Sequence, residues 1–203
     1  MCSSCVEFFP IQAILKAFIN ILLQGVSTAG GILNITFKPL TELDLPLLLT
    51  WLEKPHVKAW WDSDIVWDAS KISEKFGSYI NGYKIEDGQV KSVDAYIIYL
   101  DSRPIGYLQA YNAYDFKRSE PLIDLPQSLA AFDIFLGEAD VIGKGIGPAA
   151  IRTFFATWDK KFEYAFADPD QHNKGALRAY EKAGFEKKRE CLHTGEIWML
   201  KKI

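Results

Sequence analysis

A glycine-rich segment is the part of this sequence best suited to bind a charged ligand. Residues 142–147 read Ile-Gly-Lys-Gly-Ile-Gly and lie between a predicted strand and a helix predicted from Pro148. Glycines let the backbone approach a ligand closely, and successive amides at a helix start bind phosphate. The spacing matches neither a Walker A loop nor G-x-G-x-x-G. By itself the segment predicts either a phosphate site or only a tight turn.

Two side chains near this segment could carry out acid–base chemistry. Asp133 interrupts the apolar run Leu129–Leu136, which predicts a strand, and an unpaired carboxylate buried there would be costly. Tyr180 lies in a helix predicted over Asn173–Lys182, on the same face as Asn173. A surface aspartate at a strand kink and an ordinary half-buried tyrosine are the alternatives.

The elements that position these residues follow a mixed α/β order, with an antiparallel front half and strand–helix units behind. Alternating and β-branched runs predict strands over residues 32–38, 93–100, 105–111, 129–136 and 164–167, and again from 185 and over 196–200. Residues 101–104 predict the turn of a hairpin, and 112–128 a polar loop. Capping and apolar patterns predict a helix after Thr41 that Pro55 ends, and others over 69–81, 148–158 and 173–182.

Composition limits the class of protein. The chain has 203 residues, 49% of them hydrophobic, and a net charge of -3, which predicts a folded domain and no nucleic-acid partner. The three cysteines do not form a disulfide pattern, and Cys2 with Cys5 is a lone C-x-x-C. No His or Cys spacing predicts a metal site.

The start of the chain reads differently from the rest. The apolar stretch Ile11–Leu23 is too short to span a bilayer, and no early Lys or Arg marks a signal peptide. We therefore predict an N-terminal extension of uncertain role over residues 1–33, a catalytic domain over 34–203, no membrane association and a cytoplasmic location.

The glycine segment followed by Asn173-Lys174-Gly175-Ala176-Leu177-Arg178-Ala179-Tyr180-Glu181-Lys182-Ala183-Gly184-Phe185 resembles the GNAT superfamily of acetyltransferases. The resemblance implies an α/β GNAT fold, with a mixed central sheet flanked by helices, and acetyl-CoA as co-substrate with no metal. It implies that the glycine loop holds the CoA pyrophosphate, that Asn173 lies beside the pantetheine arm and that Tyr180 lies near the thioester sulfur. The residues it implies for acetyl-CoA are Phe135, Ile142, Gly143, Lys144, Gly145, Ile146, Gly147, Pro148 and Asn173. Ile142 stands where the family often has Gln or Arg.

Other stretches narrow the resemblance to aminoglycoside 6'-N-acetyltransferases. Residues 51–61 (WLEKPHVKAWW), residues 105–111 (IGYLQAY) and the Asp168-Pro169 pair before Asn173 are similar to segments of that group. An acidic region over residues 115–140 would attract a polycation, although such a run is also typical of a solvated face. The substrate-binding residues implied are Trp60, Trp61, Gln109, Asp115, Asp124, Asp133 and Asp168. Trp60 and Trp61 fit a core equally well, and Asp168 fits a simple turn.

These observations predict an N-acetyltransferase that moves acetyl from acetyl-CoA to a primary amine, with the 6'-amine of an aminoglycoside antibiotic as the expected acceptor. Asp133 would hold the ammonium and accept its proton, Tyr180 would donate to the sulfur, and a backbone amide, that of Phe135, would polarise the carbonyl. The alternatives are a siderophore hydroxylamine, a polyamine or a protein amine as acceptor, or a non-catalytic acyl-CoA-binding module. We expect a small-molecule amine as the partner, and a monomer or homodimer.

Overall fold

The computed structural model describes residues 26–28, 31–118 and 120–203, and the chain divides into two units at Asn34. In the first unit, β1 (Val26–Thr28) pairs antiparallel with β2 (Gly31–Leu33). The expectations for Cys2, Cys5 and the stretch 11–23 fall outside the described residues. The division into an extension and a catalytic domain stays a prediction.

The second unit is built on a seven-stranded sheet of order β10-β11-β9-β8-β7-β6-β3. Every neighbouring pair is antiparallel except β8 and β9, which are parallel. This mixed sheet confirms the predicted α/β class. The strands are β3 (Ile35–Pro39), β6 (Asp94–Leu100), β7 (Arg103–Asn112), β8 (Leu129–Leu136), β9 (Tyr164–Ala167), β10 (Glu186–Glu190) and β11 (Ile197–Lys202).

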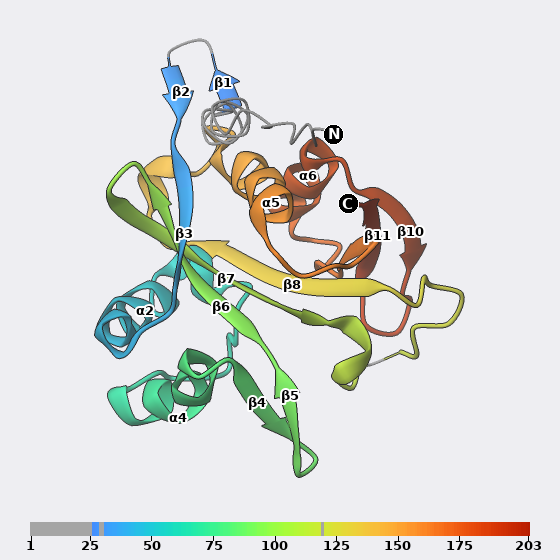
Figure 1. Ribbon diagram of the computed structural model, residues 1–203, viewed down its shortest axis with the longest axis horizontal. Coiled ribbons are helices and arrows are strands. Elements are labelled where there is room, and N and C mark those ends of the chain that lie inside the picture. The colour runs from blue at the N-terminus through green and yellow to red at the C-terminus, as the bar shows by residue number, and fades with distance from the viewer. Residues whose placement is uncertain (1–25, 29–30, 119) are drawn as a thin grey trace, which may run out of the picture. The chain divides into compact units, whose positions relative to one another are not determined.

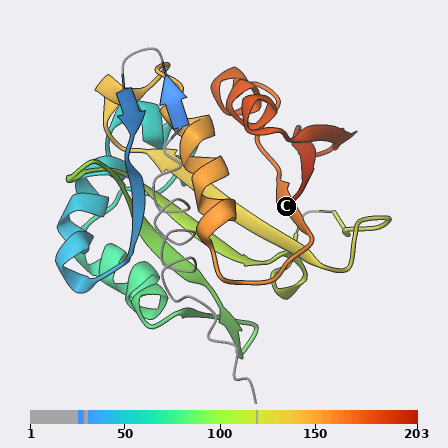
Figure 2. The same cartoon turned by 45° about the horizontal axis from the view of Figure 1, so that its top comes forward.

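Helices cover both faces of this sheet, as Figures 1 and 2 show. On one face lie α2 (Leu45–Leu52), α3 (Pro55–Lys58) and α4 (Ala69–Ile80), and on the other α5 (Ile146–Thr157) and α6 (Lys174–Ala183). Short 3-10 turns span Glu42–Asp44, Ala113–Asp115 and Ala139–Val141. The first face buries Leu48 and Trp51 of α2 and Phe76 of α4 against strand residues, so apolar burial holds the helices to the sheet.

Local signals account for most element boundaries. The Thr41 N–H donates to the Asp44 carboxylate at 2.9 Å, the capping contact expected before α2. The expectation for Pro55 is wrong, because α2 ends at Leu52 and Pro55 begins α3; proline suits a first helical turn, where its missing N–H is not needed. The hairpin turn after β6 is also shorter than expected, since Leu100 pairs directly with Arg103.

The hairpin that follows α4 was not predicted. Strands β4 (Tyr83–Glu86) and β5 (Gln89–Ser92) pair antiparallel around Asp87 and Gly88, which have φ of 50° and 74°. Positive φ at both central residues is typical of the tightest hairpin turns, for which Asp-Gly is a strong signal. The dipeptide was therefore the available clue. Among the described residues, no helix has the length and apolarity that a membrane span requires.

Candidate active site

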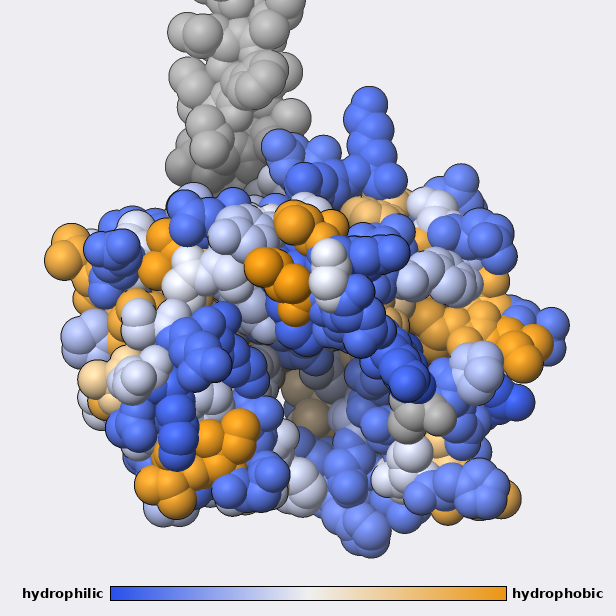
Figure 3. All heavy atoms as spheres, turned by 90° about the horizontal axis from the view of Figure 1, so that it is seen from below, coloured by the Kyte–Doolittle hydropathy of each residue, from blue (hydrophilic) through white to orange (hydrophobic). Residues whose placement is uncertain are grey.

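The candidate site is a cleft of about 760 Å³ that opens where two central strands diverge. Strands β8 and β9 pair over Leu129–Ala131 and Tyr164–Phe166, and β8 then continues to Leu136 with no described residue paired to it on that side. The cleft is lined by the end of β8, the glycine loop, the start of α6 and the residues around α3. The protein surface seen in Figure 3 is hollowed near its centre, with mostly hydrophilic residues around the hollow.

The glycine loop presents unpaired backbone amides beside this cleft. Gly143 and Gly145 have φ of 77° and 80°, a conformation that costs side-chain-bearing residues energy. Among the described residues, no backbone carbonyl accepts from the amides of residues 143–147. Ile142, Gly147 and Pro148 also line the cleft. Lys144 is exposed and Ile146 is buried in the core, and neither lines the cleft.

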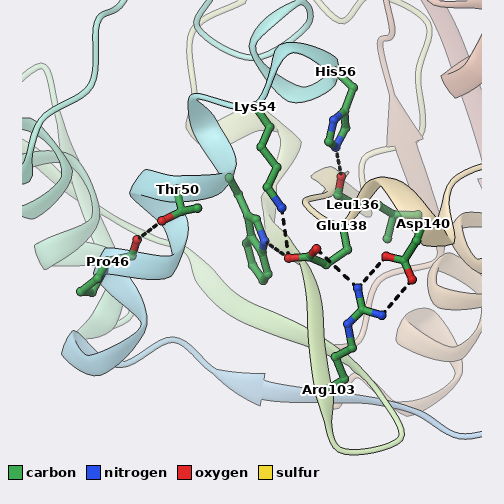
Figure 4. Close-up of polar contacts among 9 residues, drawn as sticks. Pro46, Thr50, Lys54, His56, Arg103, Leu136, Glu138 and Asp140 are labelled. Carbon is green, nitrogen blue, oxygen red and sulfur yellow. Dashed lines mark hydrogen bonds and ion pairs between the residues drawn. The ribbon is translucent and has the colours of Figure 1, made fainter.

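A polar network fixes the segment between β8 and the glycine loop (Figure 4). Glu138 accepts from the Trp51 indole at 2.7 Å and from Lys54 at 3.2 Å. Arg103 donates two hydrogen bonds to Asp140, at 2.8 and 2.6 Å. The network joins α2 and the β6–β7 hairpin to the loop, so it limits how far the amides can shift.

The register of β8 corrects the choice of backbone donor. The Gly137 N–H donates to the Ile105 carbonyl of β7 at 2.8 Å, and peptide directions alternate along a strand with regular pairing. The Phe135 amide therefore also faces β7, and the Leu136 amide faces the open edge. His56 contacts the Leu136 carbonyl on this open side, Nε2 to O, at 3.1 Å. Phe135 thus lines the cleft, but its amide points away from it, toward β7.

Asp133 lies in the cleft and is held in a defined orientation. Its Oδ2 accepts from Gln109 Nε2 at 2.8 Å and from the Tyr111 hydroxyl at 3.1 Å. The Gln109 Oε1 accepts from the Tyr107 hydroxyl at 2.9 Å. Burial, and next the charge of Asp133, hold the pKa of Tyr111 well above its usual range, so this hydroxyl stays a donor. Gln109 is not among the residues that line the cleft; it orients Asp133 instead.

Tyr180 and Asn173 meet the cleft from α6. The Tyr180 side chain packs edge-on against Phe132, with ring centroids 5.7 Å apart. Burial raises its pKa, and the charges of Asp133 and Asp168 add to the effect, so the phenol remains protonated. Asn173 caps α6, because its Oδ1 accepts from the Ala176 N–H at 3.0 Å. Both residues line the cleft, as the sequence led us to expect.

Asp168 also lines the cleft, and it already has a positively charged partner. Its Oδ2 accepts a hydrogen bond from Nη1 of Arg118. Burial raises the pKa of Asp168 to about 6, although Arg118 acts in the opposite direction, and the charge of Asp133 raises it further. Arg118 was not among the predicted site residues, and no local signal in the sequence indicates that it reaches Asp168.

The remaining predicted substrate residues are divided. Trp60, which is 50% exposed, and Trp61 line the cleft, and Trp61 packs edge-on against Phe135 at 5.0 Å between centroids. Asp115 and Asp124 do not line it, and Asp124 borders a separate depression next to β10 and β11. No group of three or more His, Cys, Asp or Glu within the described part of the chain could hold a metal ion.

Comparison with known proteins agrees with this geometry. Residues 41–192 match the family described as acetyltransferase (GNAT) domain. The chain is 29% identical over 156 residues to an aminoglycoside N(6')-acetyltransferase type 1 of Klebsiella pneumoniae, a match covering 76% of this chain and 75% of that protein. It is 27% identical to an N-hydroxyputrescine acetyltransferase of Acinetobacter baumannii, over 68% of this chain and 60% of that protein.

A solved structure is similar over most of the fold. The structure of AAC(6')-Ib in complex with paromomycin and acetyl-CoA matches with a TM-score of 0.70 and 27% identity, over 83% of this chain and 93% of that one. The match confirms the expected fold.

Proposed function

The chain belongs to the GNAT family of acetyltransferases and is an acetyl-CoA-dependent N-acetyltransferase, and within that activity we propose that it acetylates the 6'-amine of an aminoglycoside. The observation that carries the proposal is the cleft itself. The Asp133 carboxylate, the protonated Tyr180 and the free amides of the glycine loop all border it. A site that only bound acyl-CoA would need neither Asp133 nor Tyr180.

The glycine loop would hold the diphosphate of acetyl-CoA. The amides of residues 143–147 provide donors for its oxygens, and the start of α5 adds a favourable dipole. The network around Glu138 holds these donors in place before the ligand arrives. The side-chain oxygen of Asn173 accepts the capping hydrogen bond of α6, so its N–H₂ group remains available to donate to the pantetheine arm.

The chemistry then needs a neutral amine, a polarised carbonyl and a proton for the departing sulfur. Asp133 accepts a proton from the acceptor ammonium, and the amine attacks the thioester carbon. The open-edge amide of Leu136 stabilises the developing oxyanion. As the C–S bond breaks, Tyr180 gives its proton to the thiolate. The attacking nitrogen loses its second proton as the amide forms, and this proton passes through solvent to the Tyr180 phenolate. Asp133 then releases its proton to solvent, so the products are an N-acetyl amine, CoA and one proton.

Aminoglycosides are favoured by the Klebsiella and AAC(6')-Ib relatives, by the cleft carboxylates Asp133 and Asp168, and by the Trp60 and Trp61 wall. Flat indole faces suit sugar rings, and Trp60 is exposed enough to contact one. We further propose that the protein acts in the cytoplasm, where acetyl-CoA is made, and that resistance to the antibiotic follows from the modification.

The test compares two acceptors that differ at one atom. Neomycin carries an amine at 6' and paromomycin carries a hydroxyl there. With acetyl-CoA, the purified protein should release CoA thiol with neomycin and form a product acetylated at 6', as mass spectrometry and NMR would show. Equal turnover with both, or an acetyl group on another amine, contradicts the assignment of the 6'-position.

A second acceptor class is favoured by a specific observation. Arg118 already neutralises Asp168, whereas Asp133 has the uncharged hydrogen-bond partners Gln109 and Tyr111 and remains available for an acceptor ammonium. This arrangement suits a smaller, less charged amine. The N-hydroxyputrescine acetyltransferase relative points to the same class. Higher kcat/KM for N-hydroxyputrescine than for neomycin would select this function over aminoglycoside acetylation.

A further inference from the structure

Arg118 lies beside Asp133 and Asp168, the two carboxylates proposed to bind the acceptor amine. It comes from the loop before β8 and pairs with Asp168, which follows β9. Its guanidinium carbon lies 4.8 Å from the ring centroid of Phe166 and 6.0 Å from that of Tyr111. The Tyr111 hydroxyl donates to Asp133. The positive charge of Arg118 is therefore fixed close to the carboxylates that an amine substrate would bind.

This arginine is not an ordinary surface residue. Its side chain is only 12% exposed, and its buried Nε has no hydrogen-bond partner among the described residues. An unsatisfied buried donor costs free energy, so the position is maintained by the pair with Asp168 and by the Phe166 face. Arg189 offers a contrast: it stacks 5.2 Å from the Trp198 ring centroid and faces Glu120 at 4.0 Å, but is 49% exposed.

We propose that Arg118 is a specificity-determining residue that competes with acceptor ammonium groups for Asp168. The inference rests on the proposed amine acetylation and adds to it a limit on the charge of the acceptor. An acceptor with one ammonium binds at Asp133 and leaves the Arg118–Asp168 pair intact. A polycation gains from Asp168 only after displacing a guanidinium that is already stacked and desolvated.

Replacing the guanidinium should therefore change the preference between acceptors. In Arg118→Met the stem still covers Phe166, and Asp168 becomes available to a second ammonium. A charge-assisted pair of this kind changes affinity by about tenfold. We expect the KM of kanamycin to fall about tenfold, and that of a methyl 6-amino-6-deoxyglucoside, which has one ammonium, to change little.

The experiment measures kcat and KM for both acceptors by thiol release at pH 8, above the pKa of about 6 that Asp168 has in the unchanged protein. Because the charge of Arg118 opposes the effect of burial on this pKa, its loss raises the pKa of Asp168, and the measurements are repeated at pH 9. Calorimetric titration of each acceptor into the CoA complex gives the same comparison without turnover. Arg189→Met is the matched control, since it removes an arginine from an aromatic face away from the cleft. Arg118→Gln is a second variant, in case loss of the hydrogen bond to Asp168 prevents folding.

The results separate the two proposals. The inference is supported if Arg118→Met lowers KM and the dissociation constant for kanamycin but not for the single-ammonium acceptor, and if the double variant Arg118→Met/Asp168→Asn abolishes this difference. An equal loss for both acceptors, or an unchanged ratio of their dissociation constants, overturns it and leaves Arg118 a structural residue. If the unchanged protein transfers acetyl from acetyl-CoA to no amine, the proposed function is refuted. The ratio of the dissociation constants of the two acceptors, measured by calorimetry, still decides the role of Arg118.

Discussion

Replacing Asp133 with asparagine tests the assigned proton acceptor with little disturbance of its surroundings. The carboxylate accepts from Gln109 at 2.8 Å and from Tyr111 at 3.1 Å, both on the same oxygen. The amide oxygen of Asn can accept both hydrogen bonds, and its N–H₂ group takes the place of the second oxygen. The variant therefore keeps the network and loses only the negative charge and the basic site.

A positioned base contributes about 10²–10⁴-fold to the rate, which corresponds to roughly 3–5 kcal/mol of barrier. We expect kcat for the amine acceptor to fall by that factor in Asp133→Asn. The dissociation constant of acetyl-CoA should stay within about twofold, because that ligand is proposed to bind through the amides of residues 143–147. Thiol release measures the first quantity and calorimetry measures the second.

Asp101→Asn is the matched control. Asp101 is an exposed turn residue with φ of 56°, a conformation that Asn also tolerates. It should keep full activity. If Asp133→Asn loses less than about threefold in kcat, an effect expected for a surface substitution of about 0.5 kcal/mol, then Asp133 is not the base. An equal loss of acetyl-CoA affinity would mean instead that the cleft had been distorted.

Four further predictions follow from the same geometry. Tyr180→Phe should lower kcat about a hundredfold while the melting temperature is retained, because the ring still packs on its neighbours; unchanged kcat removes the proton donor. Gly145→Val places a β-branched residue at φ of 80°, a conformation that costs it about 1–2 kcal/mol. The dissociation constant of acetyl-CoA, measured by calorimetry, should therefore rise about tenfold. Normal binding would contradict the pyrophosphate site. Glu138→Ala leaves the Trp51 indole N–H without its acceptor and should lower the free energy of unfolding in urea by about 1–3 kcal/mol; an unaltered midpoint would show that the contact contributes nothing. Protonation of Asp168 below its pKa of about 6 removes its negative charge, so kcat/KM for an aminoglycoside should fall as the pH drops through 6, and the same fall in Asp168→Asn would assign it to another group.

The glycine loop and the helix after it could be read from the sequence because their signals are local. Glycine is favoured where φ is positive, and Gly143 and Gly145 adopt that conformation. Asn173 and Gly184 are residues typical of helix ends, and they cap α6 at its two ends. The apolar run that predicts β8 has the bounds of the observed strand, Leu129–Leu136.

Other features could not be read in this way. The direction of the Phe135 amide depends on which side of β8 carries β7, and the period of a strand does not contain that information. Asp115 and Asp124 share the acidic region with Asp133, but only the strand residue lines the cleft. A count of charges along the chain does not determine which of them converge.

The sequence by itself determined the kinds of residue that meet acetyl-CoA and an amine, because backbone conformation, capping and strand period are properties of neighbouring residues. Only the tertiary structure decided that Arg118 neutralises Asp168, one of the carboxylates proposed to bind the acceptor amine. Arg118 and Asp168 are 50 positions apart in the chain, and they meet only because the loop before β8 packs over Phe166 of β9. Such a pair is selected by the burial of both groups together, and no pattern within either segment encodes it.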